Sequence, residues 1–376
     1  MIIYMDNSAT TTVCPEAVEV MTKLMTESYG NPSSLHSMGL ESEKAITAAR
    51  KEIAAGVGKS DKTIYFTSGG TESDNTAIIG GAVRNAHGRK TVITSEVEHP
   101  AVLKSFAQLE KLGFNTKFVR VDKDGVIDLN HLESLLSEDV VLVSIMQVNN
   151  ETGAVMPIRE AYKMVKNARE DILFHSDMVQ SYLKVPFEEV DLASFSAHKV
   201  HGPKGVGALY VKEGVNINPI IFGGGQQKDL RPGTENVPGI AGFGAAVKTA
   251  SREKNFEKVT EIKKALTERI LNRIDNVTIN GGENALPYIL NMSFEGVKSE
   301  VLLHSLESAG IMVSSGSACS SNHPSPSHVL SAMGLKKELI DSSIRFSFST
   351  YNTIEETEIV ADALEKQVGI LRKVMR

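Results

Sequence analysis

Cysteine is scarce in this sequence, and tryptophan is absent. Only Cys14 and Cys319 occur among 376 residues. Two cysteines cannot build the disulfide framework of a small secreted protein, and they cannot supply four zinc ligands. The sequence therefore indicates a reducing compartment. Any function of a cysteine would depend on the reactivity of its thiol.

Long apolar runs and an excess of basic charge are also missing. No run approaches the ~18 apolar residues of a membrane helix. The N-terminus, MIIYMDNSAT, lacks the basic and apolar regions of a signal peptide. The net charge of -6 gives no reason to expect direct nucleic-acid binding. These absences favour a cytoplasmic protein without a membrane partner.

The remaining composition fits a globular protein of two domains. Hydrophobic residues make up 41% and charged residues 23% of the chain, which is enough for a core. Strand-like and helix-like segments alternate over the first part, which favours an α/β fold with a mostly parallel sheet. Strands are predicted at 63–67, 91–94, 140–145, 172–175, 192–195 and 207–211, and helices at 71–84 and 99–112.

A second pattern begins near Pro238. The spacing of apolar residues predicts that residues 238–275 are largely helical, and shorter predicted strands and helices follow. We expect an N-terminal segment at 1–14 near the small domain, a large domain at 15–254 and a small C-terminal domain at 255–376. In the small domain, strands are predicted at 288–294, 311–313 and 343–347, and helices at 298–309 and from 354 onward.

Two motifs lie where predicted strands end. The run SGGTES at 68–73 joins a strand to a helix, where free backbone N–H groups favour an anion. The alternative is a glycine turn with a capping Ser or Thr. Asp177 ends another strand and could keep a pyridinium nitrogen protonated, or it could simply cap the next helix.

Three further segments carry reactive or charged side chains. Lys199 lies in SFSAHKVHGPKG, where a deprotonated amine can attack an aldehyde; the alternative is a solvated loop lysine. Cys319 lies in a loop of small polar residues, unusual for a packed cysteine, so it is a candidate nucleophile or an incidental thiol. Cys14 is expected to be structural. Arg345, within a predicted strand, could bind a carboxylate or point to solvent.

Taken together, these motifs resemble the cysteine desulfurases of the class V aminotransferase family, which are fold type I pyridoxal-phosphate enzymes. The resemblance implies a mostly parallel seven-stranded sheet in the large domain and a smaller α+β C-terminal domain. The matching segments are YMDNSATT at 4–11, GNPSS at 30–34, SGGTESDN at 68–75, VEHPAV at 97–102, QVNNETG at 147–153, HSDMVQ at 175–180, SFSAHKVHGPKGVGALYV at 194–211, RPGTEN at 231–236, SSGSACSS at 314–321 and SSIRFS at 342–347.

The resemblance also implies roles for individual residues. Lys199 would hold the cofactor covalently and move protons, His99 would stack on its ring, and Cys319 would take sulfur from L-cysteine as a persulfide. Asp177 would pair with the ring nitrogen and Gln180 with the phenolic oxygen. The phosphate contacts would be Gly70, Thr71, Ser196, His198 and, from a partner subunit, Thr234; Asn150 would contact cofactor and substrate, and Asn31 and Arg345 would position the substrate.

The products implied are alanine and a Cys319 persulfide that is passed to an acceptor. Candidate acceptors are an iron–sulfur scaffold protein, a tRNA-thiolation enzyme or a cofactor-sulfuration pathway. The resemblance implies a homodimer and no intrinsic metal, although Cys319 could contact a nascent iron–sulfur cluster on a scaffold. The alternatives are a selenocysteine lyase, an aminotransferase acting on a small amino acid, or a sulfur-carrier scaffold without catalysis. The presence of Lys199 argues against the last of these.

Overall fold

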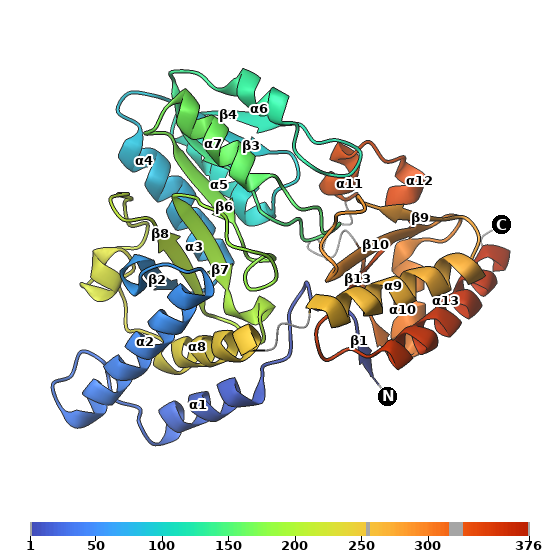
Figure 1. Ribbon diagram of the computed structural model, residues 1–376, viewed down its shortest axis with the longest axis horizontal. Coiled ribbons are helices and arrows are strands. Elements are labelled where there is room, and N and C mark those ends of the chain that lie inside the picture. The colour runs from blue at the N-terminus through green and yellow to red at the C-terminus, as the bar shows by residue number, and fades with distance from the viewer. Residues whose placement is uncertain (1, 253–255, 316–325, 375–376) are drawn as a thin grey trace.

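The larger part of the protein is built on one seven-stranded sheet (Figure 1). The computed structural model describes residues 2–252, 256–315 and 326–374. The strand order is β2-β8-β7-β6-β5-β3-β4, and only β8 runs antiparallel to its neighbours. The predicted mostly parallel seven-stranded sheet is confirmed. The strands are β2 Ile64–Thr67, β3 Thr91–Ser95, β4 Asn115–Val119, β5 Val140–Ser144, β6 Leu173–Asp177, β7 Leu192–Ser196 and β8 Gly207–Val211.

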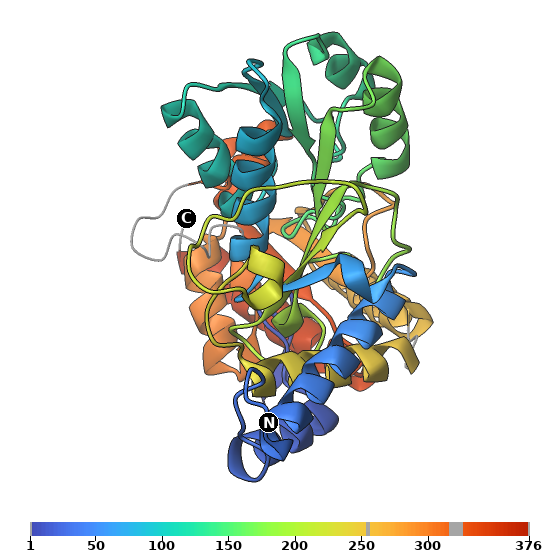
Figure 2. The ribbon, with the colours of Figure 1, turned by 90° about the vertical axis from the view of Figure 1, so that its left-hand side faces the viewer.

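Both faces of this sheet are buried, which explains the apolar strand sequences. Successive side chains of a strand point to opposite faces. In β5, Val143 belongs to one hydrophobic cluster and Leu142 to another, and Phe174 and Leu173 of β6 divide in the same way. Helices therefore cover the sheet on two sides (Figure 2). They are α1 Pro15–Thr26, α2 Ser37–Gly56, α3 Gly70–Asn75, α4 Gly81–Asn85, α5 Pro100–Lys111, α6 Leu129–Leu135, α7 Ile158–Ala168 and α8 Val237–Arg252.

The C-terminal part has a core of its own. Its four-stranded antiparallel sheet has the order β12-β13-β10-β9, and helices pack against it around residues such as Phe294, Phe346 and Leu364. The strands are β9 Val277–Asn280, β10 Ile289–Phe294, β12 Ser314–Ser315 and β13 Ser343–Ser347; the helices are α9 Phe256–Arg273, α10 Ser299–Ser308, α11 His328–Ala332, α12 Lys337–Ile340 and α13 Ile354–Val374.

The N-terminal segment joins this C-terminal part. Strand β1, Ile3–Tyr4, pairs in parallel with β11, Ile311–Met312. The chain then passes toward the large sheet, so residues 7–11 lie between the two cores. The domain limits at 14/15 and 254/255 stay predictions, and the second falls outside the described residues. None of the helices in the described ranges is long and apolar enough to cross a membrane.

Candidate active site at the carboxyl edge of the large sheet

Two neighbouring parallel strands deliver the central polar residues. Strands β6 and β7 run side by side, with Asp177 opposite Ser194. Lys199 follows β7 directly in a short 3₁₀ turn, Ala197–Lys199. Because ligands of α/β proteins bind beyond the carboxyl ends of parallel strands, this edge is where a site is expected. The structure thus brings Asp177 and Lys199 to one place from separate sequence motifs.

Asp177 and His99 form a buried pair of titratable groups. Burial raises the pKa of Asp177, whereas His99 and the N–H of Val179, 2.9 Å from Asp177 Oδ1, lower it. His99 precedes α5 and its Nδ1 accepts from the N–H of Ala101 at 3.1 Å. Burial lowers the pKa of His99, so its imidazole is held neutral with Nε2 free to carry the proton.

Lys199 is half-buried beneath the N-terminal segment. Its amine donates to the backbone carbonyls of Ser8 and, at 2.8 Å, Ala9. The Gln180 amide donates to the same Ser8 carbonyl at 3.0 Å. Among the described residues the buried Oε1 of Gln180 has no hydrogen-bond partner. A buried acceptor of this kind needs a donor, so Gln180 is a candidate ligand contact.

A backbone cradle lies beside these groups at the start of α3. A Cβ atom at Gly70 would come within 2.7 Å of Val179 Cγ2 and 3.7 Å of Ser196 Cβ, so glycine allows this close approach. The N–H groups of Gly70 and Thr71 lie in the first turn, which leaves them without intrahelical acceptors. These donors and the hydroxyl of Ser196 are suited to an anion.

His198 lies next to this cradle in sequence and bonds to the N-terminal segment. Its Nδ1 and the hydroxyl of Thr10 are 3.2 Å apart. Burial and the nearby positive charges of Lys199 and Lys204 lower the pKa of His198 to about 4. At neutral pH the ring is uncharged, so it can contact an anion only as a hydrogen-bond donor, unless the anion raises its pKa.

Arg345 is buried at the boundary between the two cores. It lies on β13, between β12 and β10, and is 6% exposed, so the alternative of a solvent-facing arginine on an edge strand is wrong. Its guanidinium donates to Asp6 Oδ1 and to the carbonyl of Asn150, each at 2.9 Å. The buried Nε has no partner among the described residues, so its N–H is available to a carboxylate.

Other predicted site residues are not brought together within one chain. Asn31 and Thr234 are exposed, and the side chain of Asn31 accepts locally from the N–H of Ser33 at 2.9 Å. Asn31 lies in the loop between α1 and α2, and this loop is at the lower left of Figure 1. Cys319 and most of its loop lie outside the described residues. Cys14 is 1% exposed and packs against Ala17 and Ala246, as a structural cysteine should.

Glu98 is a buried acid that the sequence reasoning missed. Its carboxyl group accepts from Ser95 Oγ at 2.6 Å and from the N–H of Met146 at 3.0 and 3.1 Å. Burial raises its pKa to about 8 despite these hydrogen bonds, so it is mostly protonated at neutral pH. The available signal was an acid directly before His99, three residues after the buried strand β3.

Glu98 should make the stability of the protein depend on pH. Its pKa lies near 4.5 in the unfolded chain and at about 8 in the folded one, so the folded state retains a proton that the unfolded state has lost. The free energy of unfolding should therefore fall by on the order of 1 kcal/mol per pH unit between about 5 and 8. Glu98→Gln should reduce this slope, measured by urea unfolding at several pH values. Equal slopes in both proteins would contradict the assignment.

Comparison with known proteins gives one consistent result. The family described as "Aminotransferase class-V" matches residues 3–360. The chain is similar to the cysteine desulfurase IscS of Dictyoglomus turgidum, with 44% identity covering 99% of this chain and 96% of the relative. A solved "NIFS-LIKE PROTEIN" has a TM-score of 0.92 and 39% identity, covering 98% of this chain and all of that one. "SspA in complex with cysteine" has a TM-score of 0.82 and 34% identity, covering 93% and 100%.

Proposed function

Because the chain belongs to the class V aminotransferase family, we propose that it is a pyridoxal-phosphate-dependent cysteine desulfurase. Its substrate would be L-cysteine and its products L-alanine and a persulfide on Cys319. The observation that carries the proposal is the meeting of Lys199, His99 and Asp177 at the carboxyl edge of the sheet. A lysine nucleophile, a neutral imidazole and a buried carboxylate are what this chemistry requires.

The residues at this edge fit pyridoxal phosphate. The carboxylate of Asp177 suits a protonated ring nitrogen, and the α3 cradle with Ser196 and His198 suits the phosphate. Gln180 suits the phenolic oxygen through its side-chain amide, which can rotate to expose either its free acceptor or its donors. When bound, this cofactor withdraws electrons from the α-carbon of an amino acid.

The lysine is suited to both attack and proton transfer. Its amine donates to the backbone carbonyls of Ser8 and Ala9 in the N-terminal segment. It would hold the cofactor covalently and would serve as base and acid at the substrate α-carbon. His99, neutral because of its burial, would transfer a further proton through Nε2.

Arg345 and Asn150 would orient the amino acid. The Nε–H of Arg345, unpartnered among the described residues, would donate to the substrate carboxylate, while Asp6 and the Asn150 carbonyl fix the guanidinium plane. The side chain of Asn150 would contact both the cofactor and the substrate. A homodimer would explain why Asn31 and Thr234 are exposed here, since each would complete the site of the partner subunit.

Sulfur would leave the site on Cys319. An exposed thiolate can attack the substrate sulfur, and the resulting persulfide can be delivered to an iron–sulfur scaffold protein or a tRNA-thiolation enzyme. We propose a cytoplasmic location, consistent with the two cysteines of the sequence. Selenocysteine is the second candidate substrate, because its side chain would occupy the same position.

The proposed function predicts two products in equal amounts. Purified protein loaded with pyridoxal phosphate should release alanine and sulfide in a 1:1 ratio from L-cysteine when a thiol reductant is present. The amounts should be measured by amino-acid analysis and by sulfide trapping, with L-alanine as the substrate control. Transfer of the amino group to a keto acid without sulfide release would instead identify an aminotransferase.

A further inference from the structure

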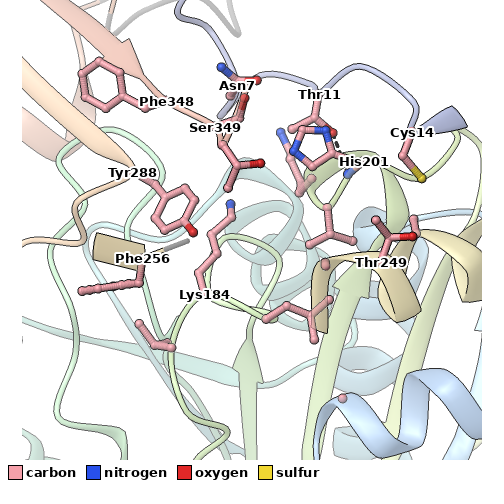
Figure 3. Close-up of a pocket in the computed structure, with 18 of the residues that line it drawn as sticks. Asn7, Thr11, Cys14, Lys184, His201, Thr249, Phe256, Tyr288, Phe348 and Ser349 are labelled. Carbon is pink, nitrogen blue, oxygen red and sulfur yellow. Dashed lines mark hydrogen bonds between the residues drawn. The ribbon is translucent and has the colours of Figure 1, made fainter. Parts of the chain in front are cut away.

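A cavity of about 760 Å³ lies behind Lys199, between the large sheet and the C-terminal part (Figure 3). It shares Lys199 and Ser8 with the candidate active site. None of the other predicted cofactor or substrate contacts lines it. Its volume falls within the range of about 300–1,000 Å³ that is typical of sites for small organic molecules. The cavity is therefore large enough to hold a ligand separate from the cofactor.

The walls of this cavity are mostly apolar. They come from α2, α8, the start of α9, the segment after β6 and the segment after β13. Among the lining residues in the described part of the chain there is no Asp or Glu, whereas two lysines are present. The apolar lining residues include Leu183, Phe187, Phe256, Tyr288 and Phe348.

Lys184 supplies an amine that pairs with no acidic group among the described residues. Figure 3 shows its side chain reaching into the cavity, with Tyr288 on one side and His201 on the other. Its Nζ lies 5.4 Å from the centre of the Tyr288 ring and makes no hydrogen bond or ion pair within the described residues. An ammonium beside an aromatic face lacks the anion that most buried lysines have.

The electrostatics of the cavity also favour an anion. Burial, together with the nearby charge of Lys199, lowers the pKa of Lys184 to about 7. A negative group between these two lysines would oppose both effects and keep the Lys184 amine protonated. The apolar walls would at the same time bury a hydrocarbon or aromatic body.

We propose that this cavity is a second ligand site, which binds a small organic carboxylate with an apolar body, the carboxylate at Lys184 and the body against Tyr288 and Phe256. The site is independent of the sulfur chemistry, since it requires none of the residues assigned to that chemistry apart from the shared wall at Lys199. The carboxylate class follows from the Lys184 ammonium in a mostly apolar cavity that has no Asp or Glu among its described lining residues.

The test uses the cofactor-loaded protein and two fluorinated probes of the same shape. The probes are 3-(4-fluorophenyl)propionate and the corresponding neutral amide, with binding followed by ¹⁹F NMR of the ligand. The carboxylate should bind at least ~10-fold more tightly than the amide, the size of one charge-assisted hydrogen bond. Lys184→Met should abolish this preference, and Lys184→Arg should retain it.

A second variant locates the bound probe. Ala250 lines the cavity from α8, so Ala250→Phe should fill part of it and weaken binding of both probes. Circular dichroism and melting temperature would confirm that each variant is folded, and Lys184→Gln replaces Lys184→Met if the latter is not. Absence of binding to the wild type, or equal carboxylate binding by wild type, Lys184→Met and Ala250→Phe, would overturn the proposal.

Discussion

Lys199→Ala is expected to abolish the covalent attachment of pyridoxal phosphate and to lower the turnover of L-cysteine by roughly 10²–10⁴-fold. The amine of Lys199 donates to the N-terminal segment, and its charge lowers the pKa of Asp177 at the carboxyl end of β6. Its loss removes both the nucleophile for the aldehyde and the proposed base at the α-carbon. The absorbance band of the lysine-bound cofactor should disappear, and borohydride should no longer fix the cofactor to the protein.

Lys204→Ala is the matched control for this experiment. Lys204 is five residues further along the same motif but is exposed, in a turn beside Gly205. Its removal should leave the absorbance spectrum and borohydride labelling unchanged. An unchanged spectrum in Lys199→Ala, or the same loss in Lys204→Ala, would mean that another lysine holds the cofactor.

The fold was predictable where burial dictated the sequence. Strand β5 is enclosed on both faces and is a nearly continuous apolar run, and the positions of β5, β6 and β7 were predicted within about two residues. Strand β4, Asn115–Val119, was missed because it is an edge strand with exposed and polar residues. The helix predicted at 71–84 contains a π-helical turn, Thr76–Gly80, which side-chain periodicity does not reveal.

The candidate site was predictable in part for a similar reason. Residues that follow parallel strands must gather at one edge, so the meeting of Asp177 and Lys199 follows from strand positions alone. The contacts of Ser8 were not predictable, because its backbone carbonyl accepts from Gln180 and Lys199, and any residue supplies a carbonyl. The roles of Asn31 and Thr234 are not tested by the structure of one chain and stay predictions.

Lys184 illustrates a different limit of sequence reasoning. In the sequence it is one lysine in the segment between two predicted strands, with no motif around it. Its position opposite Tyr288 arises only when the C-terminal part packs against the large sheet. The cavity forms only through that packing, so no local sequence pattern predicts it.

Cys319→Ala should retain bound cofactor and its absorbance spectrum, yet release no sulfide from L-cysteine above the background of the free cofactor. Lys199, His99 and Asp177 are unchanged in this variant, so L-cysteine should still enter the site and alter the spectrum. Without a thiolate to attack the substrate sulfur, the carbon–sulfur bond should stay intact and alanine should not form. Spectroscopy in the presence of L-cysteine, together with assays of both products, measures the two steps separately.

Cys14→Ala is the matched control, because Cys14 is the other cysteine of the chain and is buried away from solvent. Burial raises the pKa of its thiol, so it lacks the thiolate character of a nucleophile. This variant should keep full sulfide release, with at most a small loss of stability from the methyl-sized space left beside Ala246. Trapping of persulfide with a thiol-reactive reagent, followed by mass spectrometry, should find the extra sulfur on Cys319 in both wild type and Cys14→Ala. Sulfide and alanine release by Cys319→Ala at the wild-type rate would leave the cofactor chemistry in place but remove the persulfide from the mechanism, and the enzyme would then be a lyase acting directly on the substrate side chain.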